Sequence, residues 1–246
     1  MSTRPSKSCF RGSYSSQFPG LSPTCKLGYF LPPALFSAPF GKPRGELYND
    51  CIHPFIYQYY YSMLLNRGDQ FPAGVEFQHV PLDLDNVDVM NPLTCDRPIP
   101  LKMDNLISEL GDKNFVIVAA PGSFTPACTE NHIPGFLSNL EKLKQDKNIG
   151  AVIIITFNDP FVVSAWGKLL VQAAGLKKGK DYPKIYFASD MDGKFSGAHN
   201  MKKDNGRLER YALVVNAKTR KVGYLGLETK MGVSVSGADE VLKAKL

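Results

Sequence analysis

The chain has 246 residues, of which 43% are hydrophobic and 21% are charged, an ordinary composition for a globular protein. No apolar run approaches the ~18–20 residues that a membrane-spanning helix requires, so the sequence predicts no membrane segment. The formal net charge is +6, and residues 1–62, with six basic and two acidic side chains, account for +4 of it. Residues 63–246 are therefore nearly neutral, which argues against a nucleic-acid-binding surface there.

Residues 1–62 differ in kind from the rest of the chain. They hold 8 of the 18 prolines and 7 of the 11 tyrosines, and no acidic residue precedes Glu46. This density of Pro, Gly and Ser predicts an irregular or disordered leader. The shortage of acidic residues is typical of a mitochondrial transit peptide, although the prolines would interrupt its amphipathic helix. Alternatively, translation begins at Met63 and the leader is a gene-model artefact.

Strands and helices are predicted to alternate from Met63 onward. Uncharged runs rich in Val and Ile predict buried strands, and apolar residues at helical spacing predict the helices between them. In chain order, the predicted elements are a strand at 115–120, a helix at 133–147, strands at 150–157 and 184–189 separated by a helix from Pro160 to about Ala174, a hairpin of 211–216 with 222–226, and a helix at 238–243. This order predicts an α/β fold with a central mixed sheet flanked by helices.

Cys128 lies in the segment that carries most information. Pro121 and Gly122 end the first predicted strand, and a loop brings Thr125 and Cys128 to the start of a helix. Unpaired backbone N–H groups and the helix dipole at such a position favour the thiolate, the reactive form of cysteine. Thr125 is close enough in sequence for its hydroxyl to share a small pocket with the sulfur. The alternative is that Cys128 is a buried small hydrophobic residue, but its position favours a reactive thiol.

The other cysteines do not form a recognisable metal or disulfide pattern. The five cysteines, at 9, 25, 51, 95 and 128, include no C-x-x-C pair. Their odd number indicates a reducing compartment with functional thiols. Cys128 and His132 have helical i, i+4 spacing, but two ligands make a poor metal site, and we expect His132 to pack or hydrogen-bond near the first helical turn. The sequence thus predicts no metal and no other cofactor.

Three motifs carry a family resemblance. The pattern Pro121-x-x-x-Thr125-x-x-Cys128 resembles the active-site signature of the peroxiredoxins, thiol peroxidases built on a thioredoxin fold. The wider segment 121–136, together with 158–161 and Trp166, is similar to the atypical, type 5-like peroxiredoxins and their fungal alkyl hydroperoxide reductase relatives. Residues 67–72 resemble the usual opening of that branch. The resemblance covers residues 63–246 and implies one thioredoxin-like domain that forms a homodimer.

The resemblance also implies roles for individual residues. Cys128 would be the peroxidatic nucleophile, which attacks hydrogen peroxide or an alkyl hydroperoxide and becomes a sulfenic acid. Thr125 would hold the thiolate and the peroxide by its hydroxyl, and Pro121 would shape the pocket and shield the sulfenate. The family places an arginine just before a late strand, where Arg210 fits and Arg207 is the competitor.

The sequence leaves two alternatives for the second thiol of the cycle, because no cysteine follows Cys128. Cys95 lies 33 residues upstream, where fungal relatives with an intersubunit resolving cysteine carry theirs, and thioredoxin would then be the reductant. If Cys95 is inert, the chain resembles one-cysteine members that depend on glutathione. A dithiol–disulfide oxidoreductase would normally need a C-x-x-C pair, and a redox sensor or chaperone would use oxidised Cys128 without turnover.

The last three residues, Ala244-Lys-Leu246, are a conservative variant of the Ser-Lys-Leu peroxisomal address. They predict delivery to peroxisomes, with the cytoplasm as the alternative. A mitochondrial location would follow if the leader is a transit peptide.

Overall fold

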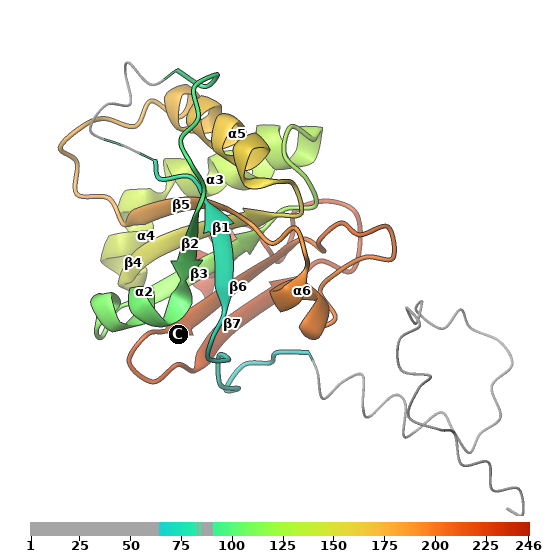
Figure 1. The fold of residues 1–246 in the computed structure, drawn as a ribbon. Helices are drawn as coiled ribbons and strands as arrows, with labels where there is room; N and C mark the ends of the chain where they lie inside the picture. Colours follow the sequence, from blue (N-terminus) through green and yellow to red (C-terminus); the bar gives the residue numbers. More distant parts are fainter. Residues whose placement is uncertain (1–63, 83, 85–90) are drawn as a thin grey trace, which may run out of the picture. The chain divides into compact units, whose positions relative to one another are not determined.

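The computed structural model describes residues 64–82, 84 and 91–246, and the predicted leader lies outside these residues. A seven-stranded sheet in the order β2-β1-β5-β4-β3-β6-β7 forms the centre of this part of the chain (Figure 1). The strands are β1 (Glu76–His79), β2 (Ile99–Lys102), β3 (Asn114–Ala119), β4 (Ile149–Thr156), β5 (Lys184–Ser189), β6 (Tyr211–Asn216) and β7 (Val222–Leu227). The helices are α2 (Met103–Leu110), η3 (Ala127–His132, a π-helix), α3 (Ile133–Ser138), α4 (Leu140–Lys147), α5 (Pro160–Ala173), α6 (Lys194–Ala198) and α7 (Ala238–Lys243).

The directions of the strands determine where a site can be built. Strands β3, β4 and β5 are parallel to one another, whereas β6 is antiparallel to β3 and β7 is antiparallel to β6. The carboxyl ends of β3, β4, β5 and β7 therefore lie at the same edge of the sheet as the amino end of β6. This shared edge brings together chain segments that are far apart in sequence.

Both faces of the sheet are covered, because side chains alternate along each strand. In β3, Val116 and Val118 pack in one core cluster with residues of α3, α4, α5 and α7. Phe115 and Ile117 point the other way and pack in a second cluster with residues of α2 and α6. The uncharged, Val/Ile-rich character of the central strands follows from burial on both faces.

Much of the predicted element order is confirmed. The strands at 184–189 and 211–216 and the helix at 238–243 have the expected bounds, and the other predicted strands and the helix from Pro160 differ by one residue or so. The predicted single helix at 133–147 is divided, because Asn139 leaves helical geometry (φ −110°, ψ 15°) between α3 and α4. The apolar residues of the two shorter helices nevertheless face the same core, since Phe136, Leu137, Leu140 and Leu143 are all buried in one cluster.

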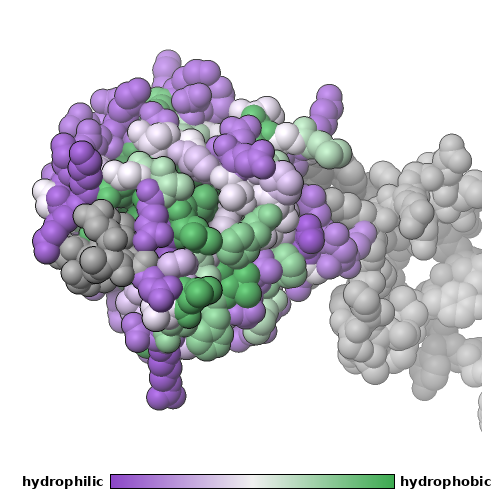
Figure 2. Space-filling model, turned by 90° about the horizontal axis from the view of Figure 1, so that it is seen from above, coloured by the Kyte–Doolittle hydropathy of each residue, from purple (hydrophilic) through white to green (hydrophobic). Residues whose placement is uncertain are grey.

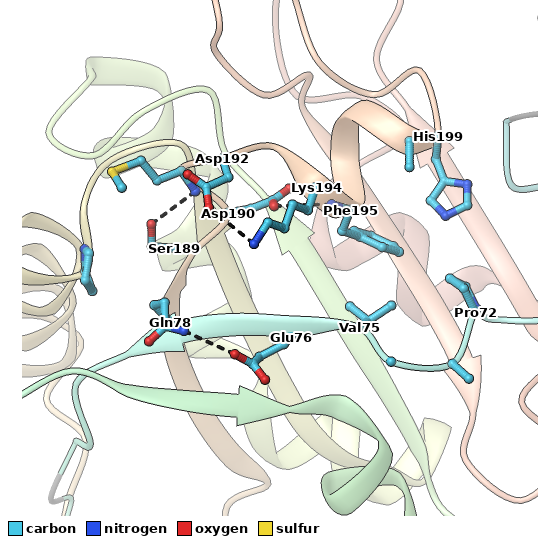
Figure 3. Close-up of a pocket in the computed structure, with 15 residues that line it drawn as sticks. Pro72, Val75, Glu76, Gln78, Ser189, Asp190, Asp192, Lys194, Phe195 and His199 are labelled. Atoms are coloured by element: carbon cyan, nitrogen blue, oxygen red, sulfur yellow. Dashed lines mark hydrogen bonds and ion pairs between the residues drawn. The ribbon is translucent and has the colours of Figure 1, made fainter.

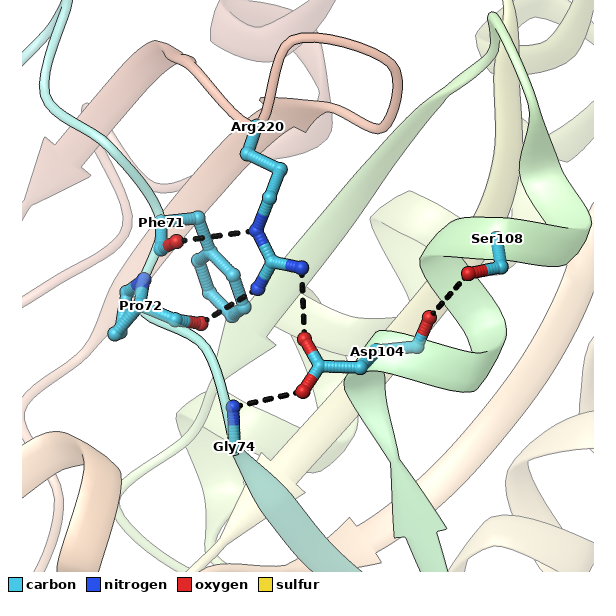
Figure 4. A network of polar contacts seen from close by, with 6 residues as sticks. All are labelled: Phe71, Pro72, Gly74, Asp104, Ser108 and Arg220. Carbon is cyan, nitrogen blue, oxygen red and sulfur yellow. Dashed lines mark hydrogen bonds and ion pairs between the residues drawn. The ribbon is translucent and has the colours of Figure 1, made fainter.

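A polar network connects the first described residues to the sheet (Figure 4). Arg220, in the turn between β6 and β7, forms a 2.7 Å ion pair with Asp104 at the start of α2. The same guanidinium donates to the carbonyl of Pro72 at 2.8 Å, while Asp104 accepts from the N–H of Gly74. The hydrogen bond from Gly74, followed by that from Arg220, lowers the pKa of Asp104. The network anchors the chain on its way into β1.

Among the described helices, none combines the length and the apolar character needed to cross a membrane.

Candidate active site

Cys128 is the second residue of the π-helix η3, at the edge where β3 ends. Its side chain is fully buried. The loop before it is fixed from the neighbouring strand, because the side-chain oxygen of Asn158, just after β4, accepts from the N–H of Ser123 at 2.8 Å. The wide turns of a π-helix are frequent at functional sites, and the structure places one around this cysteine.

Arg210 contacts the sulfur directly. Its Nη2 donates to Sγ of Cys128 at 3.4 Å. The pairing of Ala119 in β3 with Tyr211 in β6 puts Arg210 next to the end of β3, which explains how residues so distant in sequence meet. The other terminal nitrogen, Nη1, is buried and has no hydrogen-bond partner among the described residues. A guanidinium in this position stabilises negative charge on the sulfur and offers a second donor to a bound oxygen.

Arg207, the competing arginine, is used elsewhere. Its guanidinium lies over the ring of Phe157, 5.6 Å from the ring centroid. The ring of Phe157 is also one of the groups nearest to Gly122, where an added Cβ would come within 3.3 Å of it. The cation–π contact therefore lies beside the 121–127 loop, on the side of Gly122. Arg210 is the arginine that the fold brings to the sulfur.

The hydroxyl of Thr125 makes a different contact from the expected one. Oγ1 donates to the carbonyl of Gly122 at 2.9 Å. A threonine hydroxyl has a single proton, so in this arrangement it has none left for the sulfur of Cys128. Its oxygen lone pairs remain able to accept a hydrogen bond, for example from the O–H of a peroxide. Pro121, half-buried, lies at the end of β3 where the loop begins.

The second motif, 158–161 with Trp166, supports the first. Asp159 caps helix α5 by accepting from the N–H groups of Phe161 and Val162. Trp166, buried in α5, donates its indole N–H to Oγ1 of Thr129 at 3.1 Å. Helix α5 thus holds the residue next to Cys128. The resemblance identifies these residues but does not predict these contacts.

His132 lies one turn after Cys128 and is buried. Its Nε2 is 3.0 Å from the carbonyl oxygen of Ser236, and its ring packs edge-to-face on Phe136. Burial lowers the pKa of His132 to about 4, so the ring is neutral at pH 7 and Nε2 carries the proton that it donates. This agrees with the expected packing and hydrogen-bonding role. Across residues 64–82, 84 and 91–246, no group of three or more His, Cys, Asp or Glu side chains could hold a metal ion.

Glu228 is a buried carboxylate at the same edge, and sequence analysis missed it. It follows β7, and its backbone N–H donates to the carbonyl of Arg210 at 2.9 Å. Its side chain accepts from Ser234, Val235 and Ser236. Burial alone would raise the pKa of Glu228, but the hydrogen bonds from Ser234 and Ser236 outweigh burial and lower the pKa to about 2. The group is therefore an anion at pH 7.

Cys95 does not contact Cys128 within one chain; its side chain is exposed and forms no disulfide. The loop that carries it is attached to α5 through Lys168, whose side chain is buried although it is charged. Nζ of Lys168 donates to the carbonyls of Thr94, at 2.5 Å, and Asn91, at 3.4 Å. Sequence analysis did not single out this lysine, which lies within an otherwise apolar helical pattern.

A cavity of about 460 Å³ lies between β1 and the loop from β5 to α6 (Figure 3). None of the five predicted site residues lines it. Its buried carboxylate, Asp190, accepts from the N–H of Ser196 in α6 at 2.9 Å. Lys194 pairs with Asp192, and Gln78 with Glu76. These polar groups pair with one another or with the backbone of the local structure.

Comparisons with known proteins agree with this geometry. The redoxin family profile matches residues 67–242. The peroxiredoxin Pen c 3 of Penicillium citrinum is 37% identical over 182 residues, which cover 74% of this chain and 99% of that protein. The peroxiredoxin AHP1 of Chaetomium thermophilum is 40% identical, over 72% of this chain and 93% of that protein. The crystal structure of reduced Prx3 from Vibrio vulnificus in complex with hydrogen peroxide superposes with a TM-score of 0.55 at 24% identity, over 73% of this chain and 98% of that chain.

A thioredoxin-like sheet with a buried cysteine and an arginine at the ends of its strands defines a thiol-based redox protein. The chain belongs to the redoxin family, and within it to the peroxiredoxins, which are thiol-dependent peroxidases.

Proposed function

We propose that this peroxiredoxin reduces hydrogen peroxide and alkyl hydroperoxides with Cys128 as the peroxidatic nucleophile. The observation that carries the proposal is the 3.4 Å contact between Nη2 of Arg210 and Sγ of Cys128. The thiolate attacks the terminal peroxide oxygen, so that an S–O bond forms as the O–O bond breaks. The cysteine is oxidised to the sulfenic acid, and the departing hydroxide or alkoxide takes a proton from solvent.

Arg210 and Thr125 would act on different parts of the reacting peroxide. Negative charge moves from sulfur to the departing oxygen, and the unpartnered Nη1 of Arg210 is a donor available to that oxygen. Thr125, whose proton is engaged with Gly122, would accept from the peroxide O–H and so orient the molecule. Pro121 would limit the access of water to the sulfenate.

Cys95 would resolve the sulfenic acid in a homodimer. The thiol of Cys95 from a partner subunit attacks the Cys128 sulfur, forming an S–S bond and releasing water. Thioredoxin then supplies two electrons and two protons to restore both thiols. Exposure of Cys95 supports this step, since an exposed thiol is accessible to a second subunit. If Cys95 is not used, glutathione would attack the sulfenic acid instead.

Exposed apolar surface supports the dimer. Hydrophobic residues gather between hydrophilic ones on the face seen in Figure 2. Two exposed aromatic residues belong to segments that build the site: Phe124 (53% exposed) in the Cys128 loop and Phe161 (51%) at the start of α5. Phe124 also has a φ of 58°, a conformation that costs a non-glycine residue roughly 1 kcal/mol. An aromatic side chain held out in this way suits a contact with a second subunit.

A peroxisomal location is the proposal that the last three residues support. A relative from Lipomyces kononenkoae that is named as a peroxisomal peroxiredoxin is 38% identical over 181 residues. The cytoplasm and the mitochondrion remain the alternatives.

Peroxide consumption with a regenerating thiol tests the proposal. The wild-type protein is expected to remove many equivalents of hydrogen peroxide in the presence of thioredoxin or glutathione, whereas Cys128→Ser removes none, because a serine hydroxyl stays protonated at this position. Circular dichroism of the serine variant checks that the fold is intact. A redox sensor would instead consume one equivalent and stop, and near-normal activity of Cys128→Ser would refute the proposal.

A further inference from the structure

Three segments meet at Glu228. Its backbone N–H donates to the carbonyl oxygen of Arg210. Its side-chain oxygen Oε1 accepts from three consecutive backbone N–H groups, those of Ser234 (2.6 Å), Val235 (2.8 Å) and Ser236 (2.9 Å). Successive N–H groups that converge on one oxygen form an anion-binding nest. The hydroxyls of Ser234 and Ser236 add two further bonds.

The segment held by this carboxylate contacts the helix of Cys128. The carbonyl of Ser236 accepts from Nε2 of His132 at 3.0 Å. His132 ends η3, the helix in which Cys128 is the second residue. A continuous chain of hydrogen bonds therefore runs from Arg210 through Glu228 and Ser236 to His132, and both of its ends belong to segments that carry the reacting pair.

We propose that Glu228 is a positioning residue of the peroxidase reaction, which sets the distance between the guanidinium of Arg210 and the sulfur of Cys128. The inference rests on the proposed role of those two residues. Glu228 touches neither the sulfur nor the peroxide. It holds the start of β6 on one side and, through the 234–236 turn, the end of η3 on the other.

The burial of Glu228 explains why its side-chain oxygens need several hydrogen-bond donors. Glu228 is 8% exposed, and a buried charge is costly unless hydrogen bonds compensate for it. Five bonds from 234–236 provide that compensation, so this turn is ordered around the carboxylate. Without the carboxylate, the three N–H groups would lose their acceptor, and the turn would have to rearrange together with the carbonyl that holds His132.

The test compares two reactions of the same thiol. Reaction with hydrogen peroxide requires both a thiolate and a donor for the departing oxygen, whereas alkylation by iodoacetamide requires the thiolate only. The ratio of the two rate constants therefore reports the alignment of Arg210 among variants whose stability to urea matches that of the wild type, since a destabilised variant would expose the buried Cys128 to iodoacetamide more often. Trp166, the only tryptophan of the chain, bonds to the residue next to Cys128 and is a fluorescent reporter for stopped-flow measurements.

Glu228→Ala and Glu228→Asp are both expected to lower the peroxide-to-iodoacetamide ratio by about 10-fold, which corresponds to misalignment of the donor in roughly nine of ten molecules. Aspartate keeps the charge but is one carbon–carbon bond shorter, so it remains informative if the alanine variant does not fold. Glu228→Gln keeps an oxygen for the nest and is expected to retain most of the ratio. Glu240→Gln, which removes a charge from α7 where Glu240 pairs with Lys243, is the matched control and should leave the ratio unchanged.

Two failures are distinguishable. If Arg210→Met lowers the ratio but the folded Glu228 variants do not, Glu228 is only structural and this inference is wrong, while the proposed function stands. If Arg210→Met itself leaves the ratio unchanged, or wild-type Cys128 reacts with peroxide no faster than an ordinary thiol, the proposed function fails first.

Discussion

The guanidinium of Arg210 donates to the sulfur of Cys128 at 3.4 Å, although the two residues are 82 positions apart in sequence. The antiparallel pairing of β3 with β6 creates this contact, because it places the residue before β6 beside the loop that follows β3. Arg210 and Arg207 were both candidates for the arginine beside the reactive sulfur. Only Arg210 of the two contacts the sulfur, since Arg207 stacks on Phe157 instead.

Replacing Arg210 with methionine should slow the reaction of Cys128 with hydrogen peroxide about 100-fold, the usual effect of removing one donor from a developing oxyanion. Alkylation of Cys128 should also slow, because the thiolate loses the cation beside it. Stopped-flow tryptophan fluorescence gives the first rate, and the rate of reaction with iodoacetamide gives the second. Arg207→Met is the control and should change either rate by less than about threefold. A reversed order of the two variants would show that the wrong arginine has been assigned.

Protonation of His132 should destabilise the fold in acid. The pKa of His132 is about 4 in the folded protein and about 6.5 in an unfolded chain, so only the unfolded chain binds a proton between these values. Stability is therefore complete above pH 6.5, falls as the pH decreases towards 4, and levels off below that. The pKa difference corresponds to a loss on the order of 3 kcal/mol.

Urea unfolding of the wild type and of His132→Gln at several pH values between 4 and 7 measures this effect. Glutamine can donate to the carbonyl of Ser236 but does not titrate, so the contributions of His79 and the carboxylates cancel in the difference between the two proteins. The difference in unfolding free energy should change with pH in the window from 6.5 to 4. Parallel curves would show that His132 is not buried as a neutral ring.

The sequence predicted the parts of the molecule that depend on local pattern. The continuous apolar runs of β3, β4 and β6 could be recognised because strands buried on both faces exclude polar residues. Strands β1 and β2 escaped recognition because each is only four residues long and includes polar side chains, EFQH and IPLK, and because β2 contains a proline. Such segments become strands only through their pairing with each other and with β5.

The site residues likewise divide into those that a local pattern predicts and those that depend on the tertiary fold. Cys128 and Arg210 could be placed by motif, but nothing local distinguishes Glu228 or Lys168 from a solvent-exposed charge. Their roles depend on backbone groups that the fold brings to them: the 234–236 turn for Glu228, and the carbonyls of Asn91 and Thr94 for Lys168. The bond of Thr125 to Gly122 is local, yet it competes with a bond to the sulfur, and spacing alone does not decide between them.

Lys168→Met should loosen the loop that carries Cys95. The ammonium holds the carbonyls of Asn91 and Thr94, and hydrogen bonds to charged groups each contribute about 1.5–3 kcal/mol. Methionine fills the same space in α5 without a donor, so helix α5 itself should remain.

Amide hydrogen exchange in residues 91–97 is expected to accelerate at least 10-fold in Lys168→Met, while the first oxidation of Cys128 by peroxide is unchanged. Lys168→Arg keeps a donor and serves as the control. Equal exchange in all three proteins would mean that the loop is held by other contacts.

Cys95→Ser should separate the two halves of the catalytic cycle. Peroxide leaves Cys128 as a sulfenic acid in every version of the mechanism, and the versions differ in which thiol attacks next. If the exposed Cys95 of a partner subunit attacks, one equivalent of peroxide gives a covalent dimer on non-reducing gels. Cys95→Ser should then abolish that dimer and thioredoxin-supported turnover, while the first oxidation step keeps its rate.

Cys9, Cys25 and Cys51 could form a similar covalent dimer, so the decisive protein carries serine at these three positions and retains Cys95 and Cys128. Intact mass after oxidation distinguishes a sulfenic acid, a mixed disulfide with glutathione and a disulfide-linked dimer. If this protein stays monomeric when oxidised and still turns over with glutathione, Cys95 is not the resolving thiol and the chain is a one-cysteine peroxidase. If it forms the dimer and neither Cys95→Ser nor Cys128→Ser does, the intersubunit disulfide between Cys95 and Cys128 is established, because a Cys95–Cys95 or a Cys128–Cys128 disulfide would survive in one of the two variants.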